Sequence, residues 1–455
     1  MLLTINSYLL LLPASIKPFN LRLPFTPVAV AVPSTVAQVQ AAVACGAHAK
    51  VLITANSGGH SYASHGLRGE DGHLMIDMRL FNDVTVESSS GIAVVGVGGR
   101  LGNIAQSLFN NGERAVSHGT CPGVGIGGHV IGGGYGFSSR THGLALDNLV
   151  EAQVVLANST VVTASVTENS DLFWAIRGAG ASYGIITNYK FQTYPAPAQS
   201  ITFQYPLNLS QKEVKAVYMT LQHYASTTMP GGMSMRLFVN ADFIALMGVF
   251  YGTKQAFQTA IQPILRKVGN PTGEVSQMGY LDTLSTFAYG NLTLPLDYDV
   301  HETFFSKSLM TAAVTDAVAD AFWAYLPVAK SVKREWFLLI DLHGGPSSAI
   351  SKVPANATSY AHRHTIFKYE FYDRVTNGTY PSDGFSFFND WVATITNTMN
   401  PSGVGMYINY ADPTLTTEEA QHYYWLDHYS RLEDIKKAYD PTNIFSNPQS
   451  VGRGN

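Results

Sequence analysis

Residues 119–136 read GTCPGVGIGGHVIGGGYG, and nine of these eighteen residues are glycine. Glycine makes up about 7 % of an average protein, so this run needs a local explanation. Without Cβ atoms, a backbone can approach a bulky ligand closely and point several N–H groups at it. The spacing is not the G-x-G-x-x-G turn between a strand and a helix. One alternative is a glycine loop packed against itself, but Cys121 at its head and His129 within it favour a cofactor.

Two further glycine segments flank this run in the sequence. Residues 56–62, NSGGHSY, follow the apolar run Val51–Thr54, which predicts a buried strand that leads into paired glycines. Such a turn suits a diphosphate, although a tight turn with a surface histidine would have the same pattern. Residues 171–186, DLFWAIRGAGASYGII, predict a short amphipathic helix, a glycine loop and a strand. Core packing explains the aromatic residues there, whereas a bulky neighbour better explains the glycines.

The composition of this 455-residue chain limits its partners. Charged residues make up 13 %, against about 25 % in an average domain, and the net charge is −4. The chain has no run of Lys and Arg, so we expect no nucleic acid partner. No apolar stretch reaches the ~18 residues of a membrane span, so we expect no membrane span. We also expect no bound metal. The length predicts two or three domains in what we expect to be a monomer.

The first thirteen residues, MLLTINSYLLLLP, are apolar, but no Lys or Arg precedes the apolar run as in a normal secretory signal. Residues 1–19 are therefore either the remnant of a signal or a buried first strand. Five N-x-S/T sequons and the low charge favour a secreted glycoprotein. These sequons begin at Asn158, Asn208, Asn291, Asn356 and Asn377.

The sequence contains two cysteines in different surroundings. Cys45 follows Val36, Val39 and Val43, which recur at helical spacing, so we expect a small buried core residue. Cys121 lies in a loop between glycines. The alternative is a disulfide between the two, which a secreted chain would allow.

Short strands alternate with helices over residues 20–197, which predicts a mixed α+β domain. Ser34 or Thr35 can cap a helix that ends near Cys45–Gly46. The expected strands are Ile92–Val97, Ala152–Leu156 and Gly184–Tyr189. The two prolines of YPAPAQS, residues 194–200, indicate a boundary.

Residues 198–422 predict a second domain, in which an antiparallel sheet is backed by helices. Its expected helices cover 211–226, 254–268 and 313–327, and its expected strands are Ile201–Tyr205, Met233–Asn240, Trp336–Asp341, Phe367–Tyr372 and Met406–Tyr410. A closing segment, residues 423–455, contains a predicted helix at Tyr429–Tyr439.

The three glycine segments, in this order, resemble the FAD-linked oxidases with a vanillyl-alcohol-oxidase-type (PCMH-type) FAD-binding domain. The tail from Tyr423 to Ser450 is similar to the closing segment of the berberine-bridge-enzyme-like group. The segments around His60 and Cys121 look most like those of the fungal glucooligosaccharide and chitooligosaccharide oxidases. The resemblance implies that residues 20–197 form a PCMH-type FAD-binding domain, that 198–422 bind substrate, and that 423–455 return to the FAD-binding domain.

The resemblance also implies two covalent bonds to the flavin, from His60 to the 8α-methyl and from Cys121 to C6. Val124 matches a position where a small β-branched residue goes with oxygen access, which implies an oxidase that makes hydrogen peroxide. The other residues that the resemblance places around FAD are Ser57, Gly58, Gly59, Ser61, Gly119, Thr120, Gly125, Gly128, His129, Gly132, Gly133, Gly136, Gly184, Ile186 and Tyr424.

Hydride transfer from an alcohol requires a base for the hydroxyl proton, and a phenol needs help to act as one near neutral pH. Tyr410, in the Y-I-N-Y run at 407–410, matches the family base, and Asp341 matches the aspartate that assists it. A carboxylate beside a phenol disfavours the phenolate, so either the proton passes between them or a third group shares it. Because side chains alternate on a strand, we expect Tyr407 and Tyr410 to face opposite ways. Without the resemblance, both would be ordinary half-buried strand residues.

Tyr62, Glu370 and Tyr407 are the expected substrate contacts. The oligosaccharide oxidases tend to carry glutamine where this chain has Glu370, a departure that bears on sugar specificity. Leu426 and His428 stand where much of the wider family has glycine and asparagine.

We therefore expect an FAD-dependent oxidase that converts the anomeric hydroxyl of an oligosaccharide to a lactone and reduces O2 to H2O2. One alternative is the same flavin chemistry on a secondary metabolite such as an alkaloid or polyketide. Another is a flavin-bearing binding protein with little turnover, against which Tyr410 and Asp341 argue.

Overall fold

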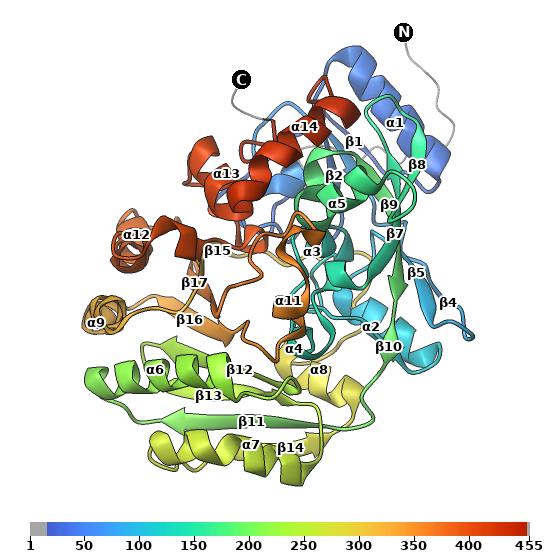
Figure 1. The fold of residues 1–455 in the computed structure, drawn as a ribbon. Helices are drawn as coiled ribbons and strands as arrows, with labels where there is room; N and C mark the ends of the chain where they lie inside the picture. The colour runs from blue at the N-terminus through green and yellow to red at the C-terminus, as the bar shows by residue number, and fades with distance from the viewer. Residues whose placement is uncertain (1–15, 453–455) are drawn as a thin grey trace.

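The computed structural model describes residues 16–452 (Figure 1). Its N-terminal part contains a parallel sheet of order β1-β3-β2 and an antiparallel sheet of order β4-β5-β9-β7-β8. The strands are β1 (Ala29–Ala31), β2 (Ile53–Asn56), β3 (Leu74–Asp77), β4 (Val84–Val86), β5 (Ile92–Gly96), β7 (Leu149–Val155), β8 (Val161–Ser165) and β9 (Ile185–Gln192). The main helices are α1 (Val36–Ala49), α2 (Leu101–Asn110), α3 (Ile126–Ile131) and α5 (Ser170–Ala179). The predicted mixed α+β character is confirmed.

The second part is built on one eight-stranded antiparallel sheet of order β14-β11-β13-β12-β16-β17-β15-β18. In that order the strands are Glu274–Met278, Ser200–Leu207, Ile244–Phe250, Met233–Asn240, Glu335–Leu342, Phe367–Val375, Thr303–Thr311 and Val404–Gly405. The helices α6 (Gln211–Thr227), α7 (Lys254–Lys267), α9 (Asp316–Ala324) and α12 (Asp383–Thr396) belong to this part. This is the predicted sheet backed by helices.

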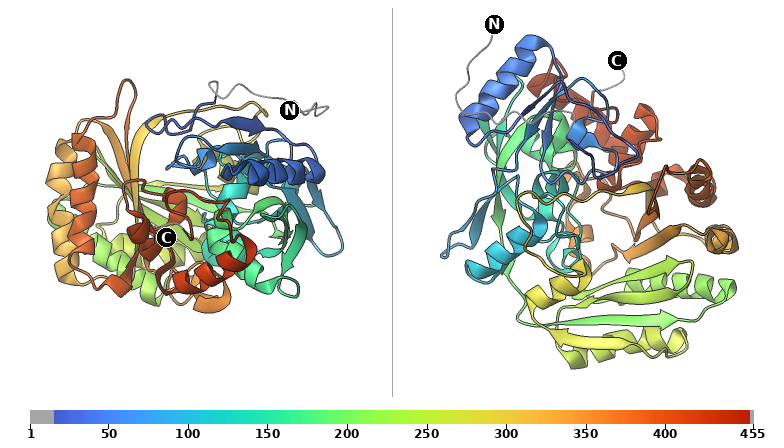
Figure 2. Two further views of the ribbon diagram at one scale, coloured as in Figure 1. Left: turned by 90° about the horizontal axis from the view of Figure 1, so that it is seen from above. Right: turned by 180° about the vertical axis from the view of Figure 1, so that it is seen from behind.

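The two faces of the eight-stranded sheet differ because side chains alternate along each strand. On β16, Trp336, Leu338 and Ile340 are buried, and the Trp336 ring packs edge-on against Trp391 of α12. The intervening residues Phe337 and Leu339 line a cavity on the other face. Helices α9 and α12 lie on the side of the sheet away from the N-terminal part (Figure 2).

The C-terminal helices α13 (Thr417–Trp425) and α14 (Tyr429–Tyr439) return to the N-terminal part, beside α5 (Figure 1). The indole of Trp425 donates to the carbonyl of Gly178 at 3.0 Å, and the hydroxyl of Tyr183 donates to the carbonyl of Leu432 at 2.8 Å. The end of the chain therefore closes over the last glycine loop.

Several local predictions are wrong. Helix α1 is capped by Thr35 as expected but continues to Ala49. Cys45 is exposed, because the buried stripe of α1 consists of Val39, Ala42, Val43 and Gly46, and Cys45 falls outside it. The long glycine run is not all loop, since α3 forms inside it.

The expected strand Met406–Tyr410 is also wrong. Strand β18 ends at Gly405, and Ile408–Tyr410 form a turn of 3-10 helix. The prediction for residues 1–19 falls largely outside the described residues. Over residues 16–452, no helix is long and apolar enough to cross a membrane.

Candidate active site

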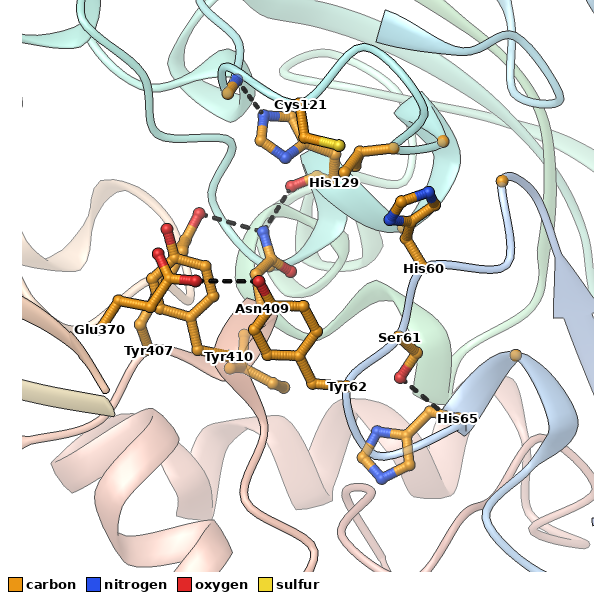
Figure 3. A pocket seen from close by; sticks show the side chains of 18 of the residues that line it. His60, Ser61, Tyr62, His65, Cys121, His129, Glu370, Tyr407, Asn409 and Tyr410 are labelled. Carbon is orange, nitrogen blue, oxygen red and sulfur yellow. Dashed lines mark hydrogen bonds between the residues drawn. The ribbon is translucent and has the colours of Figure 1, made fainter. Parts of the chain in front are cut away.

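A cavity of about 1210 Å³ lies between the glycine loops and the open face of the eight-stranded sheet (Figure 3). Sites for one small ligand are typically about 300–1,000 Å³, so this cavity has room for a large cofactor with a substrate beside it.

Gly58 and Gly125 bring two of the glycine loops into direct contact. A Cβ on Gly58 would lie 2.3 Å from the nitrogen of Gly125, and one on Gly125 would lie 2.1 Å from the nitrogen of Gly58. Neither position can therefore carry a side chain. Arg100 fastens the same loops, because its Nη1 donates to the carbonyls of Gly58 (3.0 Å) and Gly123 (2.6 Å). Sequence reasoning missed Arg100, which stands outside any recognisable motif.

His60 and Cys121 stand on these two loops and both line the cavity (Figure 3). Burial, with smaller contributions from Arg100 and His301, lowers the pKa of His60 to about 3, so the imidazole is neutral at physiological pH. The protein atoms around the cavity partly desolvate the Cys121 thiol and raise its pKa, although backbone N–H groups oppose this. Cys121 is exposed at the cavity wall and is free, as is Cys45, so the disulfide alternative fails.

A row of charges crosses the open face of the sheet. Arg236 on β12, Asp341 on β16 and Lys368 on β17 are register partners on adjacent strands. Arg236 Nε donates to Asp341 Oδ1 at 2.8 Å. Lys368 Nζ forms an ion pair with Oδ2 at 2.7 Å, but the angles are not those of a hydrogen bond. Burial alone would raise the pKa of Asp341, but the two cations outweigh it and hold that pKa below its usual value. Asp341 is therefore an ionised residue that fixes both cations.

Lys368 connects this row to Tyr410. Its Nζ donates to the Tyr410 hydroxyl at 3.3 Å and lies 4.6 Å from the ring centroid. Burial, followed by the carboxylates of Glu370 and Asp341, raises the pKa of Tyr410 well above 10. An ammonium in contact with the phenol oxygen favours the phenolate. Lys368 is therefore the third group that the aspartate–tyrosine pair requires, and sequence reasoning missed it.

Tyr407 and Tyr410 do not face opposite ways, because the chain turns as a 3-10 helix rather than a strand. Their ring centroids are 5.1 Å apart and both residues line the cavity. The Tyr407 hydroxyl accepts hydrogen bonds from the backbone N–H groups of Gly134 (3.0 Å) and Tyr135 (3.2 Å) and from Asn409 Nδ2 (3.0 Å). Its oxygen is thus committed to the glycine loop, whereas that of Tyr410 is held by a side-chain cation.

Tyr62 and Glu370 meet beside Tyr410. The Tyr62 hydroxyl donates to Glu370 Oε1 at 2.9 Å (Figure 3), and the rings of Tyr62 and Tyr410 are stacked with centroids 5.6 Å apart. Burial raises the pKa of Glu370, against the opposing effects of Lys368 and of hydrogen bonds from Tyr62 and Tyr410. The phenol of Tyr410 thus stands between an ammonium and a carboxyl.

The structure brings most of the residues expected around FAD into the wall of one cavity. These are Ser57, Gly58, Gly59, His60, Ser61, Gly119, Thr120, Cys121, Val124, Gly125, Gly128, His129, Gly132, Gly184 and Ile186.

Gly133, Gly136 and Tyr424 do not line this cavity. Gly133 lies against the ring of Tyr407, which a Cβ would approach to 2.9 Å. A Cβ on Gly136 would meet the carbonyl of His118. Tyr424 accepts from the N–H of Asp412 at 3.1 Å and is buried, so it supports the turn that follows Tyr410.

Loops without side chains suit a long nucleotide cofactor, and a neutral imidazole and a thiol are the nucleophiles that bond to an electrophilic carbon. These residues fit an FAD. With a tyrosine held by a cation opposite, the fold and the site define a flavin-dependent oxidoreductase.

The comparisons with known proteins agree. The family described as FAD binding domain matches residues 27–165, and the family Berberine and berberine like matches residues 406–452. Xylooligosaccharide oxidase of Thermothelomyces thermophilus is 45 % identical over 96 % of this chain and 89 % of that protein. Glucooligosaccharide oxidase of Sarocladium strictum is 42 % identical over 95 % of this chain and 89 % of that protein. The chain belongs to the berberine-bridge-enzyme-like family of FAD-linked oxidases.

Solved structures give the same result for the fold. Xylooligosaccharide oxidase from Myceliophthora thermophila C1 in complex with xylobiose matches with a TM-score of 0.94 at 44 % identity, covering 96 % of this chain and 94 % of that one. Glucooligosaccharide oxidase from Acremonium strictum matches with a TM-score of 0.95 at 40 % identity, covering 98 % of this chain and 97 % of that one. The FAD of that enzyme is described as 6-S-cysteinyl, 8α-N1-histidyl.

Proposed function

We propose that this protein holds FAD through covalent bonds to His60 and Cys121 and oxidises the anomeric hydroxyl of an oligosaccharide to a lactone, with O2 as electron acceptor and H2O2 as product. The observation that carries the proposal is the hydrogen bond from Lys368 to Tyr410, which lines the same cavity as His60 and Cys121. Relatives that act on xylo- and glucooligosaccharides support a sugar substrate.

The flavin, when bound, supplies the hydride acceptor. The protein supplies the base: Tyr410 takes the proton of the substrate hydroxyl, and Lys368 stabilises the phenolate that this requires. Asp341 does not reach the cavity and acts through Lys368, which it holds at 2.7 Å. Asp341 is thus a positioning residue. Tyr62, Glu370 and Tyr407 surround the same phenol and form the substrate end of the site.

The rest of the proposal concerns oxygen, domains and location. Val124 lines the cavity three residues after Cys121, where a small side chain leaves oxygen a path to the flavin. The protein acts as a monomer, with residues 20–197 and 423–455 around FAD and 198–422 around the substrate. Secretion as a glycoprotein is supported by the exposure of all five sequon asparagines, Asn158, Asn208, Asn291, Asn356 and Asn377.

Replacement of Tyr410 by Phe tests this mechanism. Tyr410→Phe keeps the stacked ring but removes the base, so the rate of anaerobic flavin reduction by an oxidisable sugar should fall roughly a hundred- to ten-thousand-fold. Lys368→Met should also slow reduction and shift its pH profile to higher pH, because the phenolate loses its cation. Lys330→Met, which changes a lysine of the cavity wall, is the matched control. Near-normal flavin bleaching in Tyr410→Phe would assign the base to another residue.

A further inference from the structure

Phe19 covers one face of the His60 imidazole. The two ring centroids are 4.2 Å apart and the ring planes are inclined by 23°. The Phe19 ring also lies 5.5 Å from that of Phe304 on β15 and 6.2 Å from that of Tyr62. The Phe19 ring therefore lies between the loop that carries His60 and the start of β15 in the second part.

Hydrogen bonds do not orient this imidazole. A functional histidine is usually oriented by a hydrogen bond on one ring nitrogen. The His129 ring follows this rule, because its Nε2 accepts from the N–H of Gly119 at 3.1 Å. The His60 ring has no hydrogen-bond partner within residues 16–452. The stacked ring of Phe19 is therefore the aromatic contact that restrains its plane.

Phe19 is itself held by the second part of the molecule. The carbonyl of Phe19 accepts from the N–H of Glu302 at 2.8 Å, and the N–H of Leu21 donates to the carbonyl of Glu302 at 2.8 Å. His301 Nδ1 lies 2.8 Å from the carbonyl of Pro18. The short segment around Phe19 thus pairs like a strand with the residues that enter β15. The ring reaches His60 only when the two parts of the chain have docked.

We propose that Phe19 is the positioning residue for flavin attachment at His60, and that it links this attachment to the folded state of the whole molecule. The inference rests on the covalent bond proposed for His60. In that bond formation the flavin methyl loses a hydrogen, the imidazole loses its N–H hydrogen, and a C–N bond forms. The two hydrogens, with their electrons, reduce one O2 to H2O2, so atoms and electrons balance. Phe19 holds the neutral ring in the plane that the new bond requires.

The test uses Cys121→Ser as parent, because His60 is then the single covalent anchor. Flavin that stays with acid-denatured protein is compared with total bound flavin, and the modified peptide is identified by mass spectrometry. Phe19→Leu keeps a branched apolar side chain but removes the stacked ring. We expect it to retain FAD non-covalently, with less than half of the covalent flavin of the parent and an unchanged melting temperature. Phe19→Tyr should restore attachment.

The control is Phe109→Leu, which removes a ring that is stacked on Tyr280 and does not line the cavity, and it should leave covalent flavin at the parent level. Full attachment in Phe19→Leu would overturn the proposal. A loss of total flavin and of melting temperature in proportion to the covalent loss would overturn it too, because the role would then be structural. Absence of covalent flavin from the Cys121→Ser parent would instead refute the proposed bond at His60.

Discussion

Glu370 is the residue at which this site departs most clearly from a neutral sugar pocket. Its carboxyl accepts from Tyr62 at 2.9 Å and lies on the same face of β17 as Lys368. Burial raises the pKa of Glu370 above its ordinary value of 4.5, in spite of the opposing effects of Lys368, Tyr62, Tyr410 and Arg236. The other charged or titratable groups that face it are Cys121, Tyr372 and Tyr407.

This raised pKa predicts a pH-dependent difference between the protein and Glu370→Gln. A group whose pKa is higher in the folded than in the unfolded state binds more protons when folded, so its stabilising effect is full below pH 4.5 and is lost as the pH rises through the folded pKa. The melting temperature of Glu370→Gln relative to that of wild type should therefore be lowest at pH 4.5 and should rise as the pH approaches neutral. Thermal melting of both proteins across this range is the measurement. If the melting temperature of Glu370→Gln instead falls relative to that of wild type towards neutral pH, ionisation of the buried carboxyl does not destabilise the fold.

The resemblance of whole motifs named His60, Cys121 and Tyr410 as candidate site residues, but it did not name the residues that support them. Arg236 and Lys368 reach Asp341 because three strands align in one register. Arg236 and Asp341 are more than 100 residues apart in the sequence. Register between distant strands is not written in local sequence. A partial signal existed, because charged residues alternate with aromatic ones over residues 367–371, as on a strand with one polar face.

At the scale of elements, the predictions held where local pattern and tertiary structure agree. Strand β12 and helix α14 have the predicted limits, Met233–Asn240 and Tyr429–Tyr439. The strand predicted to end at Tyr410 failed, because tertiary contacts override its alternating pattern. Asn409 donates to the carbonyl of His129 at 2.9 Å, which bends the chain towards the glycine run.

The C-terminal segment has a strained element boundary at Leu426, where α13 ends. Its φ of 49° and ψ of −130° belong to a region that glycine occupies freely and branched residues avoid. Leu426→Gly should remove this strain and raise the free energy of unfolding by about 1 kcal/mol. Thermal or chemical denaturation measures the change.

The matched control for this prediction is Asp427→Gly, one residue later and exposed. Its φ is negative, so glycine there adds only chain entropy to the unfolded state and should destabilise by roughly 0.5–1 kcal/mol. Equal losses of stability in the two variants would show that Leu426 is not strained.

At the scale of the whole molecule, the site is made where the N-terminal part and the second part meet from opposite sides. The glycine loops of the N-terminal part present His60 and Cys121, and the sheet of the second part presents Glu370 (Figure 3). Lys368 lies on the same face of that strand as Glu370. The turn after β18, also in the second part, adds Tyr410. The order of motifs predicted this architecture, but the contacts across it depend on docking, as the pairing of Phe19 with Glu302 shows.

The measurement that tests the central claim most directly is product analysis on a panel of mono- and oligosaccharides under air, with xylo-, gluco- and chitooligosaccharides included. The account predicts one H2O2 for each sugar oxidised, with the reducing end converted to a lactone or its aldonic acid, by protein that stays yellow after acid precipitation. Silence on every sugar from protein that still holds its flavin would contradict the carbohydrate assignment and favour a secondary metabolite as the substrate.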